Sequence, residues 1–177
     1  LSNNVSLSVS PYLHNHNEIA TAFSDRGFEI WMDAASITLD MNNDHGSLAL
    51  NPANNFENNI ALLTRQLDNK DKLTGIVLKP RSLIIETDEL WSSIVNDLFA
   101  EGYGIVDNTA QVMKPSLFFY EDRRAPYIKG DQVLDETMPL TDFRQALSNV
   151  RKSVKEQGRM IVTIPVTSPA TLDILVD

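Results

Sequence analysis

Short apolar runs alternate along the chain with longer stretches in which apolar residues recur at helical spacing. Residues 5–9 alternate apolar and small polar side chains, which is typical of a half-buried strand. Residues 75–78 contain only glycine and aliphatic side chains, as in a buried strand of a parallel sheet. The pattern predicts strands at residues 5–9, 28–32, 75–78, 104–107 and 160–164, and less regular ones at 116–120 and 133–135.

Helices are predicted between these strands. Thr87 and Thr141 are suitable N-caps for the helices that follow them, and Gly27, Gly102 and Gly158 stand where helices should end. The predicted helices are residues 15–26, 54–67, 88–100, 142–157 and a short final helix that Pro169 opens. Strands that alternate with helices of this length predict an α/β fold with a mostly parallel sheet and helices packed outside it.

Composition supports one folded domain over residues 1–177. The chain is 42% hydrophobic and 22% charged, which is ordinary for a globular protein of this length. Acidic residues outnumber basic ones by 24 to 15, and the net charge is -9. Since nucleic-acid affinity rests largely on basic side chains that neutralise phosphates, nucleic acid is an unfavourable partner.

Several kinds of chemistry and targeting find no support in the sequence. The chain has no cysteine, which excludes disulfides, thiolate metal sites and cysteine nucleophiles. It contains no Gly-rich phosphate loop, no nucleophile elbow and no apolar run long enough to span a bilayer. No signal peptide is visible, but the chain starts at Leu1, so we expect a fragment or a processed form.

Five phrases, taken in order, resemble the divergent polysaccharide deacetylase family over essentially the whole chain. Residues 74–82 stand at the place of the family's Gly-Val-Asn-Asn-His-Met-Gly-Ser, and residues 101–108 at that of Gly-Leu-Phe-Phe-Leu-Asp-Ser. Residues 131–135 are similar to Asp-Val-Phe-Leu-Asp, and residues 161–172 to a strand that ends in Gly-His-Pro-His-Pro-Glu-Thr-Leu. Residues 5–12 are similar to a strand that ends in Pro-Tyr or Pro-Phe, after which the family has a helix and a strand leading to His-Leu-Pro-Met-Glu.

The resemblance implies a (β/α) barrel-like fold and a divalent metal held by an aspartate and histidines at strand ends. Such a metal polarises the substrate carbonyl and activates a water. It also implies a first strand with an Asp-Asp pair ahead of Leu1. The family's histidines correspond to Trp31, to Lys79 and to residues 166–168, which read Val-Thr-Ser, while Asp107 keeps the acid of the Leu-Asp phrase. Because tryptophan and valine cannot ligate a metal and an ammonium repels one, we expect the metal chemistry to be lost.

These correspondences define a degenerate pocket, in which we expect no catalytic residue, no metal and no other cofactor. Its candidate residues are Trp31, Asp33, Lys79, Arg81, Asp107 and Asp135. Lys79 and Arg81 follow a strand end, where they could pair with Asp107 or with an external carboxylate. In that case ion pairs would plug the former metal site.

Other residues leave alternatives open. His14 and His16, with Asp44 and His45, could form a surface metal site, although solvated loop histidines explain them better. The acid pairs Glu86 with Asp88 and Glu121 with Asp122 could do acid–base work, although such pairs are more often helix-start or solvated charges. Tyr12 and Trp31 could stack on a sugar, whereas Trp91, Phe99 and Phe143 lie on apolar helix stripes and are expected in the core.

Three classes of function follow from the resemblance. The first is a non-catalytic descendant of the deacetylase fold that acts as a structural or scaffolding subunit in a cell-envelope assembly, with protein partners. The second is a carbohydrate-binding module that keeps the old groove. The third is an active deacetylase with a rearranged site. We favour the first because the site residues are lost while the strand and helix pattern is kept. The family resemblance also implies a periplasmic or otherwise extracytoplasmic location.

Overall fold

The computed structural model divides the chain into two compact units, residues 2–128 and residues 129–177, and each is described here by itself. It describes residues 5–39, 45–68, 70–109, 126–135, 137–166 and 168–176. The single domain expected over residues 1–177 stays a prediction.

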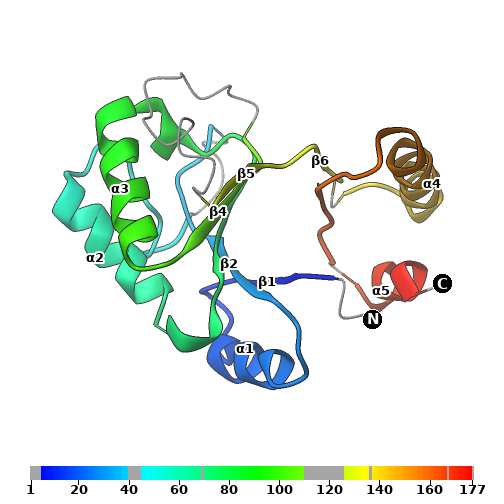
Figure 1. The fold of residues 1–177 in the computed structure, drawn as a ribbon, viewed down its shortest axis with the longest axis horizontal. Helices are drawn as coiled ribbons and strands as arrows, with labels where there is room; N and C mark the ends of the chain where they lie inside the picture. The colour runs from blue at the N-terminus through cyan, green and yellow to red at the C-terminus, as the bar shows by residue number, and fades with distance from the viewer. Residues whose placement is uncertain are drawn as a thin grey trace. The chain divides into compact units, whose positions relative to one another are not determined.

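The larger unit holds a five-stranded sheet whose strands are neighbours in space in the order of the chain (Figure 1). The strands are β1 (Leu7–Val9), β2 (Ile30–Ala34), β3 (Gly75–Leu78), β4 (Gly104–Asp107) and β5 (Tyr127–Lys129), whose last residue lies at the unit boundary. β1 to β4 pair in parallel. The predicted α/β class with a mostly parallel sheet is therefore confirmed.

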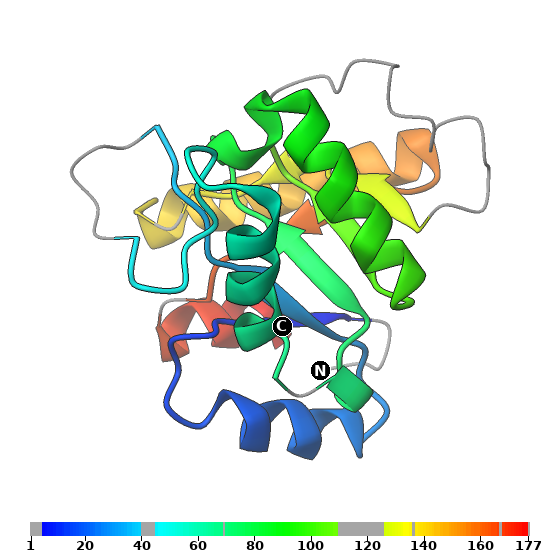
Figure 2. The ribbon, with the colours of Figure 1, turned by 90° about the vertical axis from the view of Figure 1, so that its left-hand side faces the viewer.

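The helices of this unit pack on one face of the sheet. They are α1 (His16–Ser24), α2 (Phe56–Gln66) and α3 (Asp88–Ala100), with short 3₁₀ turns at Lys70–Lys72 and Leu83–Glu86. Ala20 of α1, Leu63 of α2 and Trp91 of α3 share one apolar cluster with Met32 and Ile76 of the sheet. Figure 2 shows α2 and α3 in front of the strands. Right-handed crossovers that always step to the next strand place every connecting helix on the same side.

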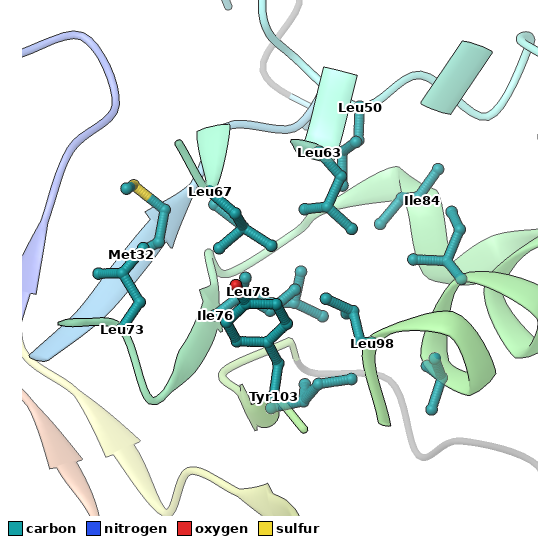
Figure 3. Close-up of a cluster of buried hydrophobic side chains, with 14 of the residues drawn as sticks. Met32, Leu50, Leu63, Leu67, Leu73, Ile76, Leu78, Ile84, Leu98 and Tyr103 are labelled. Carbon is teal, nitrogen blue, oxygen red and sulfur yellow. The ribbon is translucent and has the colours of Figure 1, made fainter. Parts of the chain in front are cut away.

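The core of the larger unit is built from this helix-facing side of the strands (Figure 3). Alternate residues of β2 and β3 point into it, and helices and turns supply the rest. The side chains labelled in Figure 3 are Met32, Leu50, Leu63, Leu67, Leu73, Ile76, Leu78, Ile84, Leu98 and Tyr103, all buried. Burial, reinforced by the charge of Glu101, raises the pKa of the Tyr103 hydroxyl. Each such aliphatic side chain contributes about 1.5–3 kcal/mol through burial.

Two glycines allow the strands to approach closely on the other face. The register aligns Trp31 with Gly75 and Gly75 with Gly104. A Cβ at Gly75 would lie 2.0 Å from the carbonyl oxygen of Gly104, and one at Gly104 would lie 3.0 Å from Trp31 Cη2. The Trp31 ring thus occupies the space that a side chain at Gly104 would need, and the Gly104 backbone occupies the space at Gly75.

A buried amide ties the loops beyond β2 to α2. The Gln66 side chain accepts from the Ala35 backbone N–H at 2.8 Å and donates to the carbonyl oxygens of Ala35 at 3.1 Å and Leu48 at 2.8 Å. After β2 the chain makes two isolated bridges, one between Ser36 and Leu50 and one between Thr38 and Ser82. Gln66 therefore replaces a missing strand partner at this point.

The smaller unit pairs two short parallel strands and carries two helices. They are β6 (Gln132–Val133), β7 (Val162–Thr163), α4 (Leu140–Gln157) and α5 (Pro169–Val176). Leu134, Phe143 and Ile174 form its buried cluster. The helix aromatics expected in a core are confirmed, since Trp91 and Phe143 are buried and Phe99 packs against the larger cluster.

Several predicted boundaries were wrong. The strand predicted at 5–9 is Leu7–Val9, and the helices predicted at 15–26 and 54–67 are His16–Ser24 and Phe56–Gln66. The strand predicted at 28–32 runs from Ile30 to Ala34, because Phe28 belongs to the turn after α1 and packs edge-on against Phe23. The helix predicted to follow Thr141 begins at Leu140, with the Pro139 carbonyl accepting from Phe143.

The bounds of the strand predicted at 160–164 were also wrong, since β7 covers only Val162–Thr163. It is shorter because Ile161 donates its N–H to the Asp131 carboxylate. The weaker strand at 133–135 lies at 132–133, and the one at 116–120 lies outside the described residues. Within the described part of the chain, every helix is too short or too polar to cross a bilayer.

We expect Gln66→Leu to lower the free energy of unfolding of the chain by about 3 kcal/mol, because it leaves buried backbone groups of Ala35 and Leu48 without their partner. Denaturant unfolding measures the change. The neighbouring exposed Arg65→Leu is the control and should change stability by less than about 0.5 kcal/mol. Equal effects of the two substitutions would contradict the role given to Gln66.

Candidate functional site

The carboxyl ends of the parallel strands bring the predicted pocket residues of β2, β3 and β4 to one edge. Ala34, Leu78 and Asp107 lie side by side in the register, so the residues around and after them form a common rim. Ligands of open α/β sheets bind beyond this edge. Of the six candidate residues, Asp33, Lys79, Arg81 and Asp107 lie on this rim.

Lys79 forms an ion pair with Asp33. Its Nζ lies 3.2 Å from Asp33 Oδ2, and the two side chains are 49% and 28% exposed. The partner of Lys79 is thus an acid of the neighbouring strand β2, whereas the predicted partners were Asp107 and an external carboxylate. A pair this exposed contributes at most about 1 kcal/mol to stability. Its main effect is to cancel the charges of the rim.

Asp107 is fully buried, and protein donors satisfy both of its carboxylate oxygens. Oδ1 accepts from the Thr109 backbone N–H at 2.7 Å and from the Thr109 hydroxyl at 2.6 Å. Oδ2 accepts from the Tyr127 hydroxyl at 2.6 Å. These bonds hold the turn after β4 and connect it to β5, so Asp107 acts here as a structural acid.

Arg81 has a left-handed backbone with φ of 63°, in the turn that follows β3. The turn is held on both sides, since the Arg81 carbonyl accepts from Leu39 at 3.2 Å and the Ser82 hydroxyl donates to the Ser36 hydroxyl at 2.7 Å. The family phrase similar to this segment has glycine at the position of Arg81. Glycine adopts this conformation without strain, so the structure gives a physical reason for that glycine.

Trp31 does not belong to the rim, which corrects its predicted place at a strand end. It is the second residue of β2, and its Nε1 donates to Glu29 Oε2 at 3.0 Å. Because β2 continues to Ala34, Asp33 is the side chain that reaches the carboxyl edge. The correspondence of Trp31 with a strand-end histidine therefore fails.

Asp135 belongs to the smaller unit and is described within it alone. Its Oδ1 accepts from the Thr137 backbone N–H at 2.8 Å and from the Thr137 hydroxyl at 2.7 Å. These bonds hold the pKa of the exposed Asp135 below its ordinary value. Asp107 and Asp135 thus make the same Asp-x-Thr turn. The Asp-x-Thr spacing at both places is visible in the sequence and indicates these turns.

Tyr12 lies just beyond β1 and is 48% exposed. Its hydroxyl donates to the His45 carbonyl at 2.8 Å and accepts from the Leu48 N–H at 3.0 Å. Its ring lies against Gly46, where any side chain would clash with it. The ring therefore has a fixed orientation while half of its surface stays open.

The described residues do not assemble the proposed surface histidine site. His14 is exposed in a turn, and His16 starts α1 with its Nδ1 2.8 Å from the Leu13 carbonyl. His45 holds Tyr12 through its backbone, and Asp44 lies outside the described residues. Within the described ranges, no three histidine or acidic side chains gather as metal ligands would.

The remaining predicted residues serve local structure or stay open. Val166 is exposed, and the Ser168 hydroxyl accepts from the Thr171 N–H at the start of α5. Glu86 ends the second 3₁₀ turn and Asp88 begins α3, and both are exposed. Thr167, Glu121 and Asp122 lie outside the described residues.

The described rim does not fit the divalent metal that the family resemblance implies. A metal site needs carboxylates and imidazoles with lone pairs directed at the ion. Here the Asp33 carboxylate faces an ammonium, and three donors of the protein occupy the lone pairs of Asp107. We therefore derive no step of catalysis through a metal.

Comparison with known proteins agrees with this architecture. A family model described as divergent polysaccharide deacetylase matches residues 1–177. The chain is similar to the crystal structure of the uncharacterized protein ATU2773 from Agrobacterium tumefaciens C58, with a TM-score of 0.83 and 14% identity. That match covers 99% of this chain and 71% of the other. No curated protein matches the sequence.

We expect Arg81→Gly to raise the free energy of unfolding by about 1 kcal/mol, because glycine removes the strain of a left-handed backbone. Thermal or denaturant unfolding tests this. Lys79→Gly, two residues earlier, is the matched control and should bring no such gain. A destabilised Arg81→Gly would show that the Arg81 side chain itself supports the rim.

Proposed function

Because the chain belongs to the divergent polysaccharide deacetylase family along its whole length, we propose that it is a non-catalytic member of that family. In this proposal it serves as a structural or scaffolding subunit of an extracytoplasmic, cell-envelope assembly. The observation that carries the proposal is the Lys79–Asp33 ion pair on the rim where the family resemblance places metal ligands.

The Lys79–Asp33 ion pair is unfavourable for metal-dependent hydrolysis. Metal-dependent hydrolysis needs a cation that polarises the carbonyl and lowers the pKa of a bound water. An ammonium beside Asp33 supplies a positive charge, but it has no empty coordination position for a water. With Asp107 committed to Thr109 and Tyr127, the described rim offers no second free carboxylate from β4.

The scaffolding role is supported by the intact fold. The parallel register, the buried core and the turns at the rim are all well formed although the ligand types have changed. A fold that is retained without its chemistry is most useful for the surface it presents. Protein partners are therefore part of the proposal.

We expect the purified chain, dialysed against zinc, to hold no zinc at unit stoichiometry and to release no acetate from acetylated glycans. Elemental analysis and an acetate assay measure this. Asp33→Asn and Asp107→Asn should leave the zinc content at the level of the wild-type chain and of Asp25→Asn. Asp25 is the matched control because it pairs with Lys72 at 2.9 Å, away from the rim.

Zinc at unit stoichiometry together with turnover, lost in Asp33→Asn and kept in Asp25→Asn, would overturn the loss of catalysis. The scaffolding role has its own test. The chain should co-purify in a stable complex from its native envelope, and a strictly monomeric chain without a partner would count against that role.

Carbohydrate binding is a second candidate function, favoured by the fixed and half-exposed ring of Tyr12. In this case a glycan array should detect binding by the wild-type chain. Tyr12→Ala should abolish that binding, because it removes the flat surface on which a sugar ring could stack. Trp31→Ala should retain it, since Trp31 lies at the start of β2. Binding that survives Tyr12→Ala would exclude this role of Tyr12.

A further inference from the structure

Helix α4 carries a basic face, defined by Arg144, Arg151, Lys152 and Lys155. At 3.6 residues per turn, Arg144, Arg151 and Lys155 lie within about 40° of one another around the helix, and Lys152 lies about 60° beyond Lys155. All four side chains are exposed. The row from Arg144 to Lys155 extends about 16 Å along the helix.

Internal pairing does not account for this face. Lys152 lies 4.0 Å from Glu156, the one ion pair that the described residues give to these four side chains. The helix dipole favours cations in the last turn, which suits Lys155. It gives Arg144 no such benefit, because Arg144 lies near the start of the helix.

The basic face contrasts with the rest of the chain. Residues 140–157 hold four basic and two acidic side chains, which leaves 11 basic and 22 acidic side chains in the remainder. Arg159 follows directly after Gly158, which ends the helix with φ of 86°. The acidic excess of the chain therefore lies outside α4 in the sequence, and α4 itself is a local region of positive charge.

We propose that the basic face of α4 binds an anionic lipid surface. A straight, exposed row of cations can meet a plane of phosphates all at once, without needing a pocket. Within residues 140–157, basic side chains outnumber acidic ones by four to two, so the local charge of α4 favours such a plane. Leu140, 43% exposed and about 20° from Arg151 around the helix, adds an apolar contact at one end of the row.

The binding is peripheral. The apolar stripe of α4 does not become available for insertion, because Phe143, Ala146 and Leu147 pack in the cluster of the smaller unit. The attraction therefore comes mainly from charge. It weakens as salt is added, because the screening length is about 10 Å at 0.1 M salt and becomes shorter above that concentration. This inference does not depend on whether the rim has lost its metal.

The test is co-sedimentation of the full chain with vesicles of phosphatidylcholine, alone or mixed in equal parts with phosphatidylglycerol. We expect binding to the mixed vesicles alone, and release by salt. R151Q/K155Q should lower the partition coefficient roughly thirtyfold, since the two basic residues each contribute a similar factor to binding of the anionic surface. R144K/R151K keeps the charges and should bind like the wild-type chain.

The matched control is R26Q/R65Q, which removes the same number of charges from exposed positions on α2 and just after α1. It should retain binding. Circular dichroism checks that every variant is folded. Binding that is absent, or equally weak in both charge-removing variants, would overturn the proposal. Binding to soluble polyglutamate without binding to vesicles would overturn it in favour of an acidic protein partner.

Discussion

The close parallel approach of β3 and β4 at Gly75 and Gly104 is the constraint on which the site depends. A side chain at Gly75 would collide with the backbone of Gly104, so the pairing requires glycine there. This register, continued to the other ends of the strands, places Leu78 beside Asp107 and Ala34 beside Leu78. The rim is therefore assembled at one edge by contacts made at the other.

The electrostatics of the rim separate two kinds of acid. Asp107 is buried, and three hydrogen bonds from Thr109 and Tyr127 make its carboxylate part of the backbone framework. Asp33 is partly open and faces the ammonium of Lys79. The rim thus combines an exposed ion pair with a buried, hydrogen-bonded acid.

Opposite charges pair on the rim, whereas basic side chains outnumber acidic ones on α4. The basic face of that helix is exposed on an otherwise acidic chain, and its apolar stripe is already used in the core of the smaller unit. The basic face of α4 is therefore available to other molecules, while the rim residue Asp107 stabilises a turn. This division is consistent with the proposed scaffolding role.

The periodic pattern predicted the order of the helices and of most strands in the described residues, because burial of one face imposes 3.6-residue and two-residue periods. It missed β5, since Tyr127–Lys129 is too short to show a period. It failed at boundaries that single contacts decide, such as the turn that holds Phe28 and the Pro139 carbonyl that starts α4. Lys79 and Asp107 could be recognised as strand-end residues because each follows or ends an apolar run.

The sequence by itself determined the α/β class, the candidate residues of the rim and the acidic balance of the chain, since these follow from local pattern and composition. Only the tertiary structure decided that Lys79 faces Asp33, that Trp31 lies at the start of its strand and that Tyr127 donates to Asp107. The two contacts join residues far apart in the sequence, so they depend on how the strands pair, and a two-residue shift of β2 was enough to exchange Trp31 for Asp33 at the edge.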